Sequence, residues 1–430
     1  MPSGASIRLW YLLYNAVLHV AALVCLPYWL AVRFFRGRYR GQFRERMGLL
    51  PPEIEEMFPV PGGALWIHAA SAGETVSAAP LVKLLKEAFP EARVLFTVTS
   101  KYGKEMAERR LGHLVDAIAF SPLDLPLFVG RFMRRIQPTL YVMVETEIWP
   151  NMLRGAKLQG TPVALASGHA GPSSFPRPFW RAVFAHVDLF LMQTESDAKN
   201  IQNRGASGDR VRVTGNMKFD GAGVRLPDSA RSELRAEFGL PEGAPVFVCG
   251  STLRDDEGPV LDTIAALRAE GMDLHAIIAP RRMERAADVQ RGCEERGLSC
   301  VRRSEGGSAT VLLLDTMGEL ARAYNVADVA YVGGGLTADV GLHNILEPAV
   351  CGVPVVFGAV HGKAARVAAE FRARAAGVEI RSGTELPAAV RSVLTVSAER
   401  ERLRAASTAL LLEHRGAAER QAKLIRELVA

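Results

Sequence analysis

The feature that most constrains this chain is an uncharged, mostly apolar run from Leu9 to Val32. A helix of that length can cross a hydrocarbon core of roughly 30 Å. Asn15, His19 and Pro27 interrupt its apolar character, so a helix lying in the membrane interface is the rival interpretation. The run is too long for the apolar core of a cleaved signal peptide. We therefore expect a membrane anchor here.

A basic cluster follows the apolar run directly, and it consists of Arg33, Arg36, Arg38, Arg40, Arg44 and Arg46. Basic residues beside an anchor attract anionic lipids and favour the cytoplasmic side, so we expect the chain that follows the anchor to lie in the cytoplasm. The net charge of +6 alone would also suit a phosphorylated substrate or nucleic acid. Nucleic acid is not expected, because the positive charge is concentrated beside the apolar run.

Beyond residue 60, short apolar runs alternate with helix-like segments, and this pattern restarts after a polar stretch at 220–233. Continuously apolar strands separated by helices indicate parallel sheets covered on both faces. The chain is therefore expected to be α/β, with two Rossmann-like domains that face one another. In such folds ligands bind beyond the carboxyl ends of the strands, so the cleft between the domains is the expected site.

A length of 430 residues favours two or three domains. The predicted segments are a membrane anchor helix (1–35), an N-terminal Rossmann-like domain (36–222), a linker (223–235), a C-terminal Rossmann-like domain (236–396) and a C-terminal helix (397–430). The five cysteines show neither CxxC pairs nor metal-ligand spacing, which indicates a reducing compartment.

Glu74 ends the stretch WIHAASAGE, where a predicted strand gives way to small residues and then to a helix. An acid in the first turn of a helix can simply complement the helix dipole. A carboxylate at the end of a strand can also act as a general base toward a hydroxyl group. Ser71 and Gly73 are small enough to let a sugar approach, and the residues alone leave both interpretations open.

Further candidates follow later strands. The loop VGGGLTADVGLHN at 332–344 offers backbone N–H groups for a phosphate, but it lacks the spacing of a dinucleotide site, so an NAD enzyme is not expected. Arg281 could hold a phosphate or carboxylate. Turn geometry and surface salt bridges are the alternatives. Glu145 and Glu147 could bind substrate, but the sequence offers no further ligands beside them and no metal site is predicted.

The order of short motifs resembles the Kdo transferases of lipopolysaccharide synthesis, which move 3-deoxy-D-manno-oct-2-ulosonic acid (Kdo) from CMP-Kdo onto a lipid A precursor. The matching pieces are WIHAASAGE, SPLDLP, ETEIWPN, GNMKFD, Ser251-Thr252, APR, DTMGEL and HNILEP. The resemblance implies the GT-B glycosyltransferase architecture and inverting transfer without a cofactor or metal. It also implies that the N-terminal domain binds the acceptor, lipid IVA, and that the C-terminal domain binds the CMP-sugar donor. The implied location is the cytoplasmic face of the inner membrane.

The resemblance also implies roles for individual residues. Glu74 matches the catalytic base of the family. The implied donor-binding residues are Pro280, Arg281, Met317, Gly318, Glu319, Gly333, Gly334, Gly341, Asn344 and Glu347. The implied acceptor-binding residues are Ser71, Gly73, Ser173 and Ser174. Lys218 is implied to lie at the hinge between the domains, with a minor role toward the donor.

The chain departs from the family pattern at 168–175, 253–258 and 359–367. In the first segment the family usually carries arginines after the strand, and this chain has GHAGPSSF. Two alternatives therefore stay open. One is a related membrane transferase that uses a different activated sugar or acceptor. The other is a membrane-bound nucleotide-binding protein without transfer activity.

Overall fold

The computed structural model describes residues 4–36, 42–171, 175–221, 225–337 and 340–429. The chain forms two compact units. Unit 1 comprises Met1–Gly221 and His414–Ala430, and unit 2 comprises Ala222–Glu413. Each unit has one seven-stranded sheet whose paired strands run parallel, so the predicted α/β class is confirmed.

The sheet of unit 1 has the strand order β3-β2-β1-β4-β5-β6-β7. Its strands are almost wholly buried and rich in Val, Leu, Ile and Phe, as expected for strands covered on both faces. In chain order they are β1 (Ala64–His68), β2 (Arg93–Val98), β3 (Ala117–Phe120), β4 (Leu140–Val144), β5 (Val163–Gly168), β6 (Leu189–Met192) and β7 (Val211–Val213).

The sheet of unit 2 has the corresponding order β10-β11-β9-β8-β12-β13-β14. Its strands are β8 (Val246–Thr252), β9 (His275–Pro280), β10 (Cys300–Arg302), β11 (Val311–Leu313), β12 (Val329–Val332), β13 (Val355–Gly358) and β14 (Val378–Ile380). In both sheets, therefore, the strand order reverses beside the first strand of the unit.

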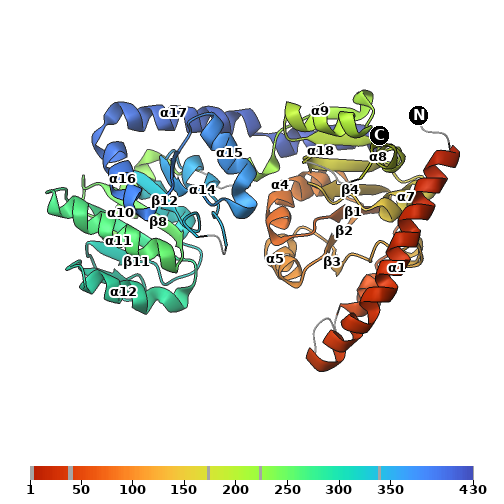
Figure 1. Cartoon of the computed structure of the whole chain (residues 1–430), viewed down its shortest axis with the longest axis horizontal. Helices are drawn as coiled ribbons and strands as arrows, with labels where there is room; N and C mark the ends of the chain where they lie inside the picture. The colour runs from red at the N-terminus through yellow and green to blue at the C-terminus, as the bar shows by residue number, and fades with distance from the viewer. Residues whose placement is uncertain (1–3, 37–41, 172–174, 222–224, 338–339, 430) are drawn as a thin grey trace. The chain divides into compact units, whose positions relative to one another are not determined.

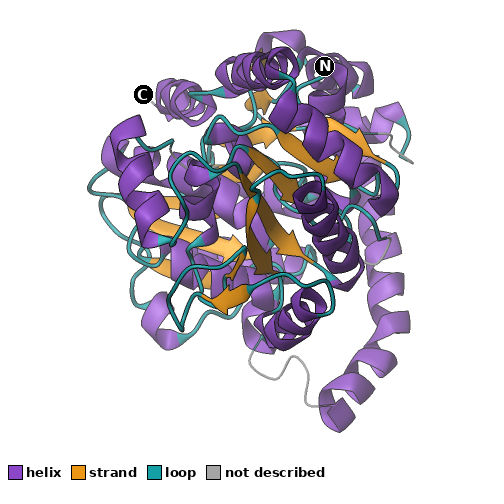
Figure 2. Cartoon of the chain, turned by 90° about the vertical axis from the view of Figure 1, so that its left-hand side faces the viewer, coloured by secondary structure: helices purple, strands orange, loops and turns teal. Residues whose placement is uncertain are grey.

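Helices lie on both sides of the strands, as Figure 2 shows, and each unit has two buried apolar clusters. The α-helices of unit 1 are α1 (Gly4–Arg36), α2 (Phe43–Arg46), α3 (Pro52–Glu55), α4 (Ala72–Ala88), α5 (Lys101–Leu111), α6 (Pro126–Ile136), α7 (Pro150–Leu158), α8 (Arg177–Phe184), α9 (Glu195–Arg204) and α18 (Ala417–Val429).

The α-helices of unit 2 are α10 (Asp228–Glu237), α11 (Arg254–Ala269), α12 (Ala286–Glu294), α13 (Leu320–Ala323), α14 (Leu346–Val350), α15 (Ala365–Ala373), α16 (Leu386–Thr395) and α17 (Ser397–His414). The predicted linker overlaps α10, because Leu234 of this helix is buried in a core of unit 2. The predicted C-terminal helix is divided into α17 and α18 at Gly416, which has a φ of 76°.

The apolar N-terminal run forms α1, which lies along unit 1 beside α7 and α8 (Figure 1). Within it, Ala5–Cys25 is long and apolar enough to cross a membrane by length and composition. The residues with reduced exposure over its first half are Ser6, Ile7, Trp10, Tyr11, Tyr14, Asn15 and Leu18. Because this spacing keeps returning to one side of a helix, α1 has a docked face and an exposed face.

The docked face of α1 is held by polar contacts. The hydroxyl of Tyr11 donates to the carbonyl of Pro150 at 2.9 Å, and the hydroxyl of Tyr14 donates to Asp124 Oδ2 at 2.9 Å. The amide of Asn151 donates to Asn15 Oδ1 at 2.7 Å. Asn15, one of the polar residues within the apolar run, is therefore explained by its bond to the first turn of α7.

Candidate functional site

The two sheets bring specific loops together at their reversal points. In unit 1, β1 pairs with both β2 and β4, so the loop carrying Glu74 after β1 lies next to the loop carrying Glu145 after β4. In unit 2, β8 pairs with β9 and β12, which places Ser251 beside the glycine loop at 333–335. Loops at such a switch point in an open α/β sheet commonly hold the ligand.

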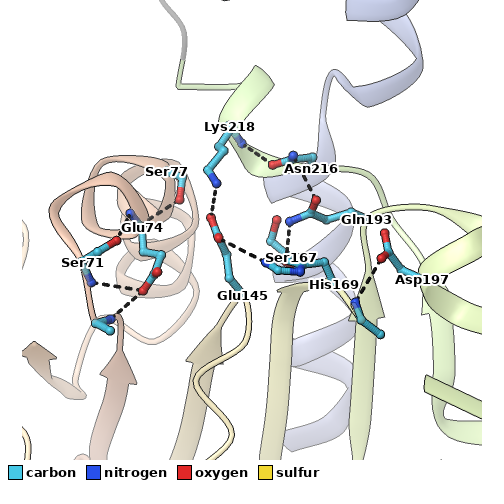
Figure 3. Close-up of polar contacts among 12 residues, drawn as sticks. Ser71, Glu74, Ser77, Glu145, Ser167, His169, Gln193, Asp197, Asn216 and Lys218 are labelled. Atoms are coloured by element: carbon cyan, nitrogen blue, oxygen red, sulfur yellow. Dashed lines mark hydrogen bonds and ion pairs between the residues drawn. The ribbon is translucent and has the colours of Figure 1, made fainter. Parts of the chain in front are cut away.

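Glu74 lies in the first turn of α4 and forms a capping box with Ser71. The Glu74 N–H donates to Ser71 Oγ at 3.3 Å, and Glu74 Oε2 accepts from the N–H groups of Ala70 and Ser71 at 2.7 and 3.2 Å. Both backbone bonds use the same oxygen (Figure 3). Within the part of the chain that the structure describes, Glu74 Oε1 has no hydrogen-bond partner. The helix-capping role therefore leaves one carboxylate oxygen available.

The surroundings of Glu74 favour its protonated form. Burial raises the pKa of Glu74, and the negative charges of Glu145 and Glu147 raise it further. The two backbone N–H groups lower the pKa but do not outweigh these effects. A carboxylate with a raised pKa is a better proton acceptor when it is ionised, and this is a common property of general bases.

Glu145 has the opposite character. Burial by itself would raise its pKa, but contacts with His169 and Lys218 lower it below the ordinary value. Lys218 Nζ lies 2.7 Å from Glu145 Oε1, and His169 Nε2 lies 3.7 Å from Oε2. Glu145 also has a φ of 61°, which a residue with a side chain rarely adopts. Two neighbouring carboxylates with pKa values pushed apart are typical of an acid–base site.

Segments from distant parts of unit 1 hold Lys218 in position (Figure 3). The Lys218 N–H donates to Asn216 Oδ1, and the Asn216 amide donates to Gln193 Oε1. The amide of Gln193 donates to the Ser167 carbonyl, and the Ser167 N–H donates to Gln421 of α18. The tail helix is thus part of the support of this site.

Glu147 is bound on the other side of the same loop. The Trp149 indole N–H donates to Glu147 Oε2 at 2.8 Å, and His68 Nε2 lies 3.4 Å from the same oxygen. His68 is fully buried at the end of β1, and its Nδ1 contacts Thr97. The structured turn that the sequence suggested at Trp149-Pro150 is therefore present, and Glu147 belongs to it.

The glycine loop of unit 2 is organised by Asp256, a fully buried acid in the first turn of α11. Asp256 Oδ2 accepts from the N–H groups of Leu253 and Gly334, each at 2.8 Å. Asp256 Oδ1 accepts from the Tyr331 hydroxyl at 2.7 Å. This carboxylate therefore ties the end of β8 to the end of β12.

The glycines of this loop leave no room for side chains. Gly334 and Gly341 have φ values of 88° and 79°, which favour glycine. A Cβ on Gly335 would lie 2.7 Å from the backbone of Gly358. Two backbone segments therefore pass each other in direct contact, and this gives a compact loop of peptide groups.

Pro280 ends β9, and Arg281 follows it with an exposed side chain. The Arg281 N–H donates to the Thr252 carbonyl at 2.9 Å, so this segment adjoins the end of β8. A Cβ on Gly333 would meet Thr252, and one on Gly334 would meet Gly341 and His343, whose pKa is lowered by burial and by the charge of Arg281. The predicted residues Pro280, Arg281, Gly333, Gly334 and Gly341 thus share one region.

The remaining donor candidates form two smaller groups. Asn344 is exposed, and its amide donates to Glu347 Oε1 at 3.1 Å. Met317 is 77% exposed, and Gly318 has a φ of 89° with open space around it. Glu319 contacts Thr316 and lies 3.0 Å from Arg303. Its carboxylate is therefore engaged by the protein itself.

The acceptor candidates fall beside Glu74 or outside the described residues. Ser71 is the N-cap of α4, and Gly73 is exposed in its first turn. Ser173 and Ser174 lie outside the described residues. Among the residues that the structure describes, no group of three or more His, Cys, Asp or Glu side chains is arranged to hold a metal ion.

Sequence reasoning missed His169 and Asp256. His169 carries no local signal, because its partner Glu145 lies on another strand. Asp256 had a signal: it is one of three acids in LRDDEG, three residues after Leu253, at the position of a capping acid.

Residues 41–221 match the family described as 3-deoxy-D-manno-octulosonic-acid transferase (kdotransferase). The 3-deoxy-D-manno-octulosonic acid transferase of Haemophilus influenzae is 29% identical over 434 residues, covering 97% of this chain and 98% of that protein. The Chlamydophila psittaci transferase is 31% identical and the alignment covers 83% of each chain. The Bordetella pertussis transferase is 32% identical, with 79% and 80% covered.

Solved structures are similar in fold. A glycosyltransferase from Rickettsia africae has a TM-score of 0.56 at 8% identity, with 85% of this chain and 98% of that chain covered. A UDP-GlcNAc 2-epimerase from Neisseria meningitidis, bound to UDP-GlcNAc, has a TM-score of 0.52 at 14% identity, with 81% and 99% covered. At these identities the likeness concerns the fold alone, and it agrees with the predicted GT-B architecture.

Proposed function

Because this chain belongs to the 3-deoxy-D-manno-octulosonic acid transferase family, we propose that it transfers Kdo from CMP-Kdo to a lipid A precursor, lipid IVA. Membership makes it a glycosyltransferase of lipopolysaccharide synthesis. The identity of donor and acceptor, inversion at the anomeric carbon and the role of each residue are the proposal.

The observation that carries the proposal is the state of the Glu74 carboxylate. One oxygen is held by two backbone N–H groups, which fixes the orientation of the side chain. The other oxygen has no hydrogen-bond partner among the described residues, and burial together with Glu145 and Glu147 raises the pKa of the group. A fixed carboxylate with one open oxygen suits a general base.

In the proposed reaction, the acceptor hydroxyl approaches Glu74 beside Ser71 and Gly73. Its oxygen forms a bond to the anomeric carbon of Kdo while its proton passes to Glu74 Oε1. The bond from the anomeric carbon to the phosphate oxygen breaks, and CMP leaves as a phosphate monoester. The reaction inverts the configuration at that carbon.

Unit 2 supplies the proposed donor site. The peptide groups of the loop at 333–335 and the guanidinium of Arg281 would receive the charge of the departing phosphate. Pro280, Gly341, Asn344 and Glu347 would line the nucleotide. Met317, Gly318 and Glu319 would also contact the donor, and for these three residues the proposal rests on the family resemblance alone. Since Arg281 and backbone dipoles meet this charge, we propose that transfer continues in the presence of a chelator.

We further propose that α1 anchors the enzyme by lying along the cytoplasmic face of the inner membrane. One face of its first half is bound to Asp124, Pro150 and Asn151 of unit 1, which a separate spanning helix would not do. Its other face exposes large apolar side chains, namely Leu9, Leu12, Leu13, Val17, Val20, Leu23 and Val24. Such a helix suits the interface, beside anionic lipids.

A transfer assay tests this function. Purified full-length protein in detergent is incubated with CMP-Kdo and lipid IVA, with and without chelator, and the lipid products are measured by mass spectrometry. We expect one or more Kdo residues on the lipid and equal release of CMP. Product with a different CMP-sugar only would favour the related-transferase alternative. Donor binding without product would favour a nucleotide-binding protein.

A further inference from the structure

A pocket of about 460 Å³ lies in unit 1 between α8 and α9, and the reaction proposed above does not use it. Its aromatic and polar lining consists of Phe175, Arg177, Trp180, Asn200, Asn203 and Arg204. Among the described residues no Asp or Glu lines the pocket, and the lining carries two positive charges and two neutral amides. This combination favours an anionic and strongly hydrogen-bonding ligand.

The two arginines are available for such a ligand. Within the described part of the chain, neither Arg177 nor Arg204 has a carboxylate partner or a side-chain hydrogen bond. The guanidinium of Arg204 lies 6.0 Å from the centre of the Trp180 ring, which orients it without neutralising it. A planar guanidinium group can bind two oxygens of one phosphate or carboxylate at the same time.

The aromatic side suits a sugar ring. Phe175 is 53% exposed, and it stacks on Phe179 at 4.8 Å between ring centroids. Trp180 stacks on Phe184 at 5.2 Å, so its ring is supported from behind. The apolar C–H face of a pyranose packs against such rings while its hydroxyls bond to amides such as those of Asn200 and Asn203.

The pocket lies within unit 1, between the loop that carries His169 and the helix α1. One wall is Ala170, whose carbonyl accepts from the Asn200 amide at 3.2 Å. Ala170 directly follows His169, which contacts Glu145. On the other side, Phe179 contacts Trp10 of α1 at 6.2 Å between ring centroids. The pocket therefore lies between the contacts of α1 and the residue that precedes Ala170, His169, which contacts Glu145.

We propose that this pocket binds an anionic sugar of the lipid acceptor, with Arg177 and Arg204 on its charged group and Trp180 against its ring. This inference rests on the proposed function. It also accounts for the family arginines that are missing at 168–175, since these two arginines supply positive charge next to that segment. A phosphate on the lipid sugar and the carboxylate of an already transferred sugar acid have this chemistry in common.

The test compares wild type with R177Q/R204Q on three acceptors: phosphorylated lipid IVA, the same lipid without phosphate, and the dephosphorylated lipid bearing one Kdo. With a phosphate-binding pocket, the variant raises KM for lipid IVA about tenfold to a hundredfold, because a charge-assisted bond is lost. The values of kcat and of KM for CMP-Kdo stay unchanged, and the dephosphorylated lipid shows no difference between the proteins. A rise confined to the third acceptor identifies the carboxylate.

K199Q is the matched control, because Lys199 is exposed on α9 but does not line the pocket. Its KM values should equal those of wild type. An unchanged KM of R177Q/R204Q for all acceptors, or an equal rise for all three, overturns the proposal.

A binding measurement separates this proposal from the function. Ligand-detected NMR with the full-length protein should show glucosamine 1-phosphate bound by wild type and K199Q, and not by R177Q/R204Q, with glucosamine as the uncharged comparison. If this pattern appears while wild type transfers no Kdo to any acceptor, the proposed function fails and the pocket stands. If wild type does not bind the phosphorylated sugar in preference to glucosamine, the pocket proposal fails.

Discussion

Unit 1 and unit 2 have sheets of the same strand order, yet they place different groups at the point where that order reverses. In unit 1 the loops after β1 and β4 carry two carboxylates, the half-buried Glu74 with a raised pKa and the buried Glu145 with a lowered one. In unit 2 the loop after β12 carries glycines, and the acid beside it, Asp256, is fully bonded within the protein.

This difference separates two kinds of chemistry. Side chains whose charge can change are suited to moving a proton, which is what a general base does. Peptide N–H groups held in a compact loop have fixed dipoles, so they can stabilise the charge of a phosphate without giving up a proton. We therefore expect substitutions in unit 1 to alter turnover and its pH dependence, and substitutions in unit 2 to alter donor affinity.

The largest effect is expected for E74Q. Glutamine keeps the capping geometry, because Glu and Gln both serve at this position, but it cannot take up a proton. We expect kcat to fall about a hundredfold to ten-thousandfold while CMP-Kdo binding is unchanged. Steady-state kinetics and donor titration measure the two quantities. A parallel loss of donor affinity and thermal stability would show that Glu74 acts only as a helix cap.

The next effect concerns the loop of unit 2. In G335A, the new methyl group would meet the backbone of Gly358, so the two segments must separate. We expect donor affinity to fall about tenfold or more, with unfolding free energy reduced by about 1 to 3 kcal/mol. G258A is the control, because nothing lies within 4 Å of a Cβ on Gly258 of α11. Wild-type donor affinity in G335A would contradict the role given to this loop.

A shift in the pH profile is expected for E145Q. The negative charge of Glu145 raises the pKa of Glu74, so its removal lowers that pKa. Activity requires ionised Glu74 and falls as the pH drops through its pKa. The acidic limb of the kcat/KM profile should therefore move to lower pH. No shift, or a shift to higher pH, would mean that these carboxylates do not interact in the free enzyme.

The smallest effect tests the anchor contact in unit 1. Y14F removes the hydroxyl that donates to Asp124, a carboxyl group whose pKa burial raises to about 7. We expect a loss of about 1 kcal/mol in unfolding free energy, measured by denaturant titration. L12A should leave that value unchanged and weaken vesicle binding, because Leu12 is 68% exposed on the other face of α1. Equal stability of Y14F and wild type would argue against docking through this bond.

Much of the architecture was predictable because it rests on local patterns. Apolar strands alternating with amphipathic helices indicate parallel sheets wherever they occur, and the glycine loop and the turn at Glu74 are contiguous in the chain. The family resemblance added roles to those same short motifs. The capping box of Glu74 is also a local pattern, and it explains why the two interpretations of this residue were both open: one carboxylate can cap the helix and keep an oxygen free.

The features that the sequence could not predict depend on residues far apart in the chain. His169 and Lys218 contact Glu145 only because the segments that follow β4, β5 and β7 come together at the carboxyl ends of the strands. Asp256 reaches Gly334 across two neighbouring strands. Tyr14 bonds to Asp124 because α1 packs along unit 1. Arg177 and Arg204 line the same pocket because α8 and α9 pack together.

The amino-acid sequence by itself determined the α/β class, the two repeats of strand and helix, the apolar first helix and the family, since each follows from spacing and composition within short windows. Only the tertiary structure decided which charges lie together. The pKa of a carboxyl group depends on burial and on charges within a few ångströms, and those neighbours are brought in by the packing of distant segments.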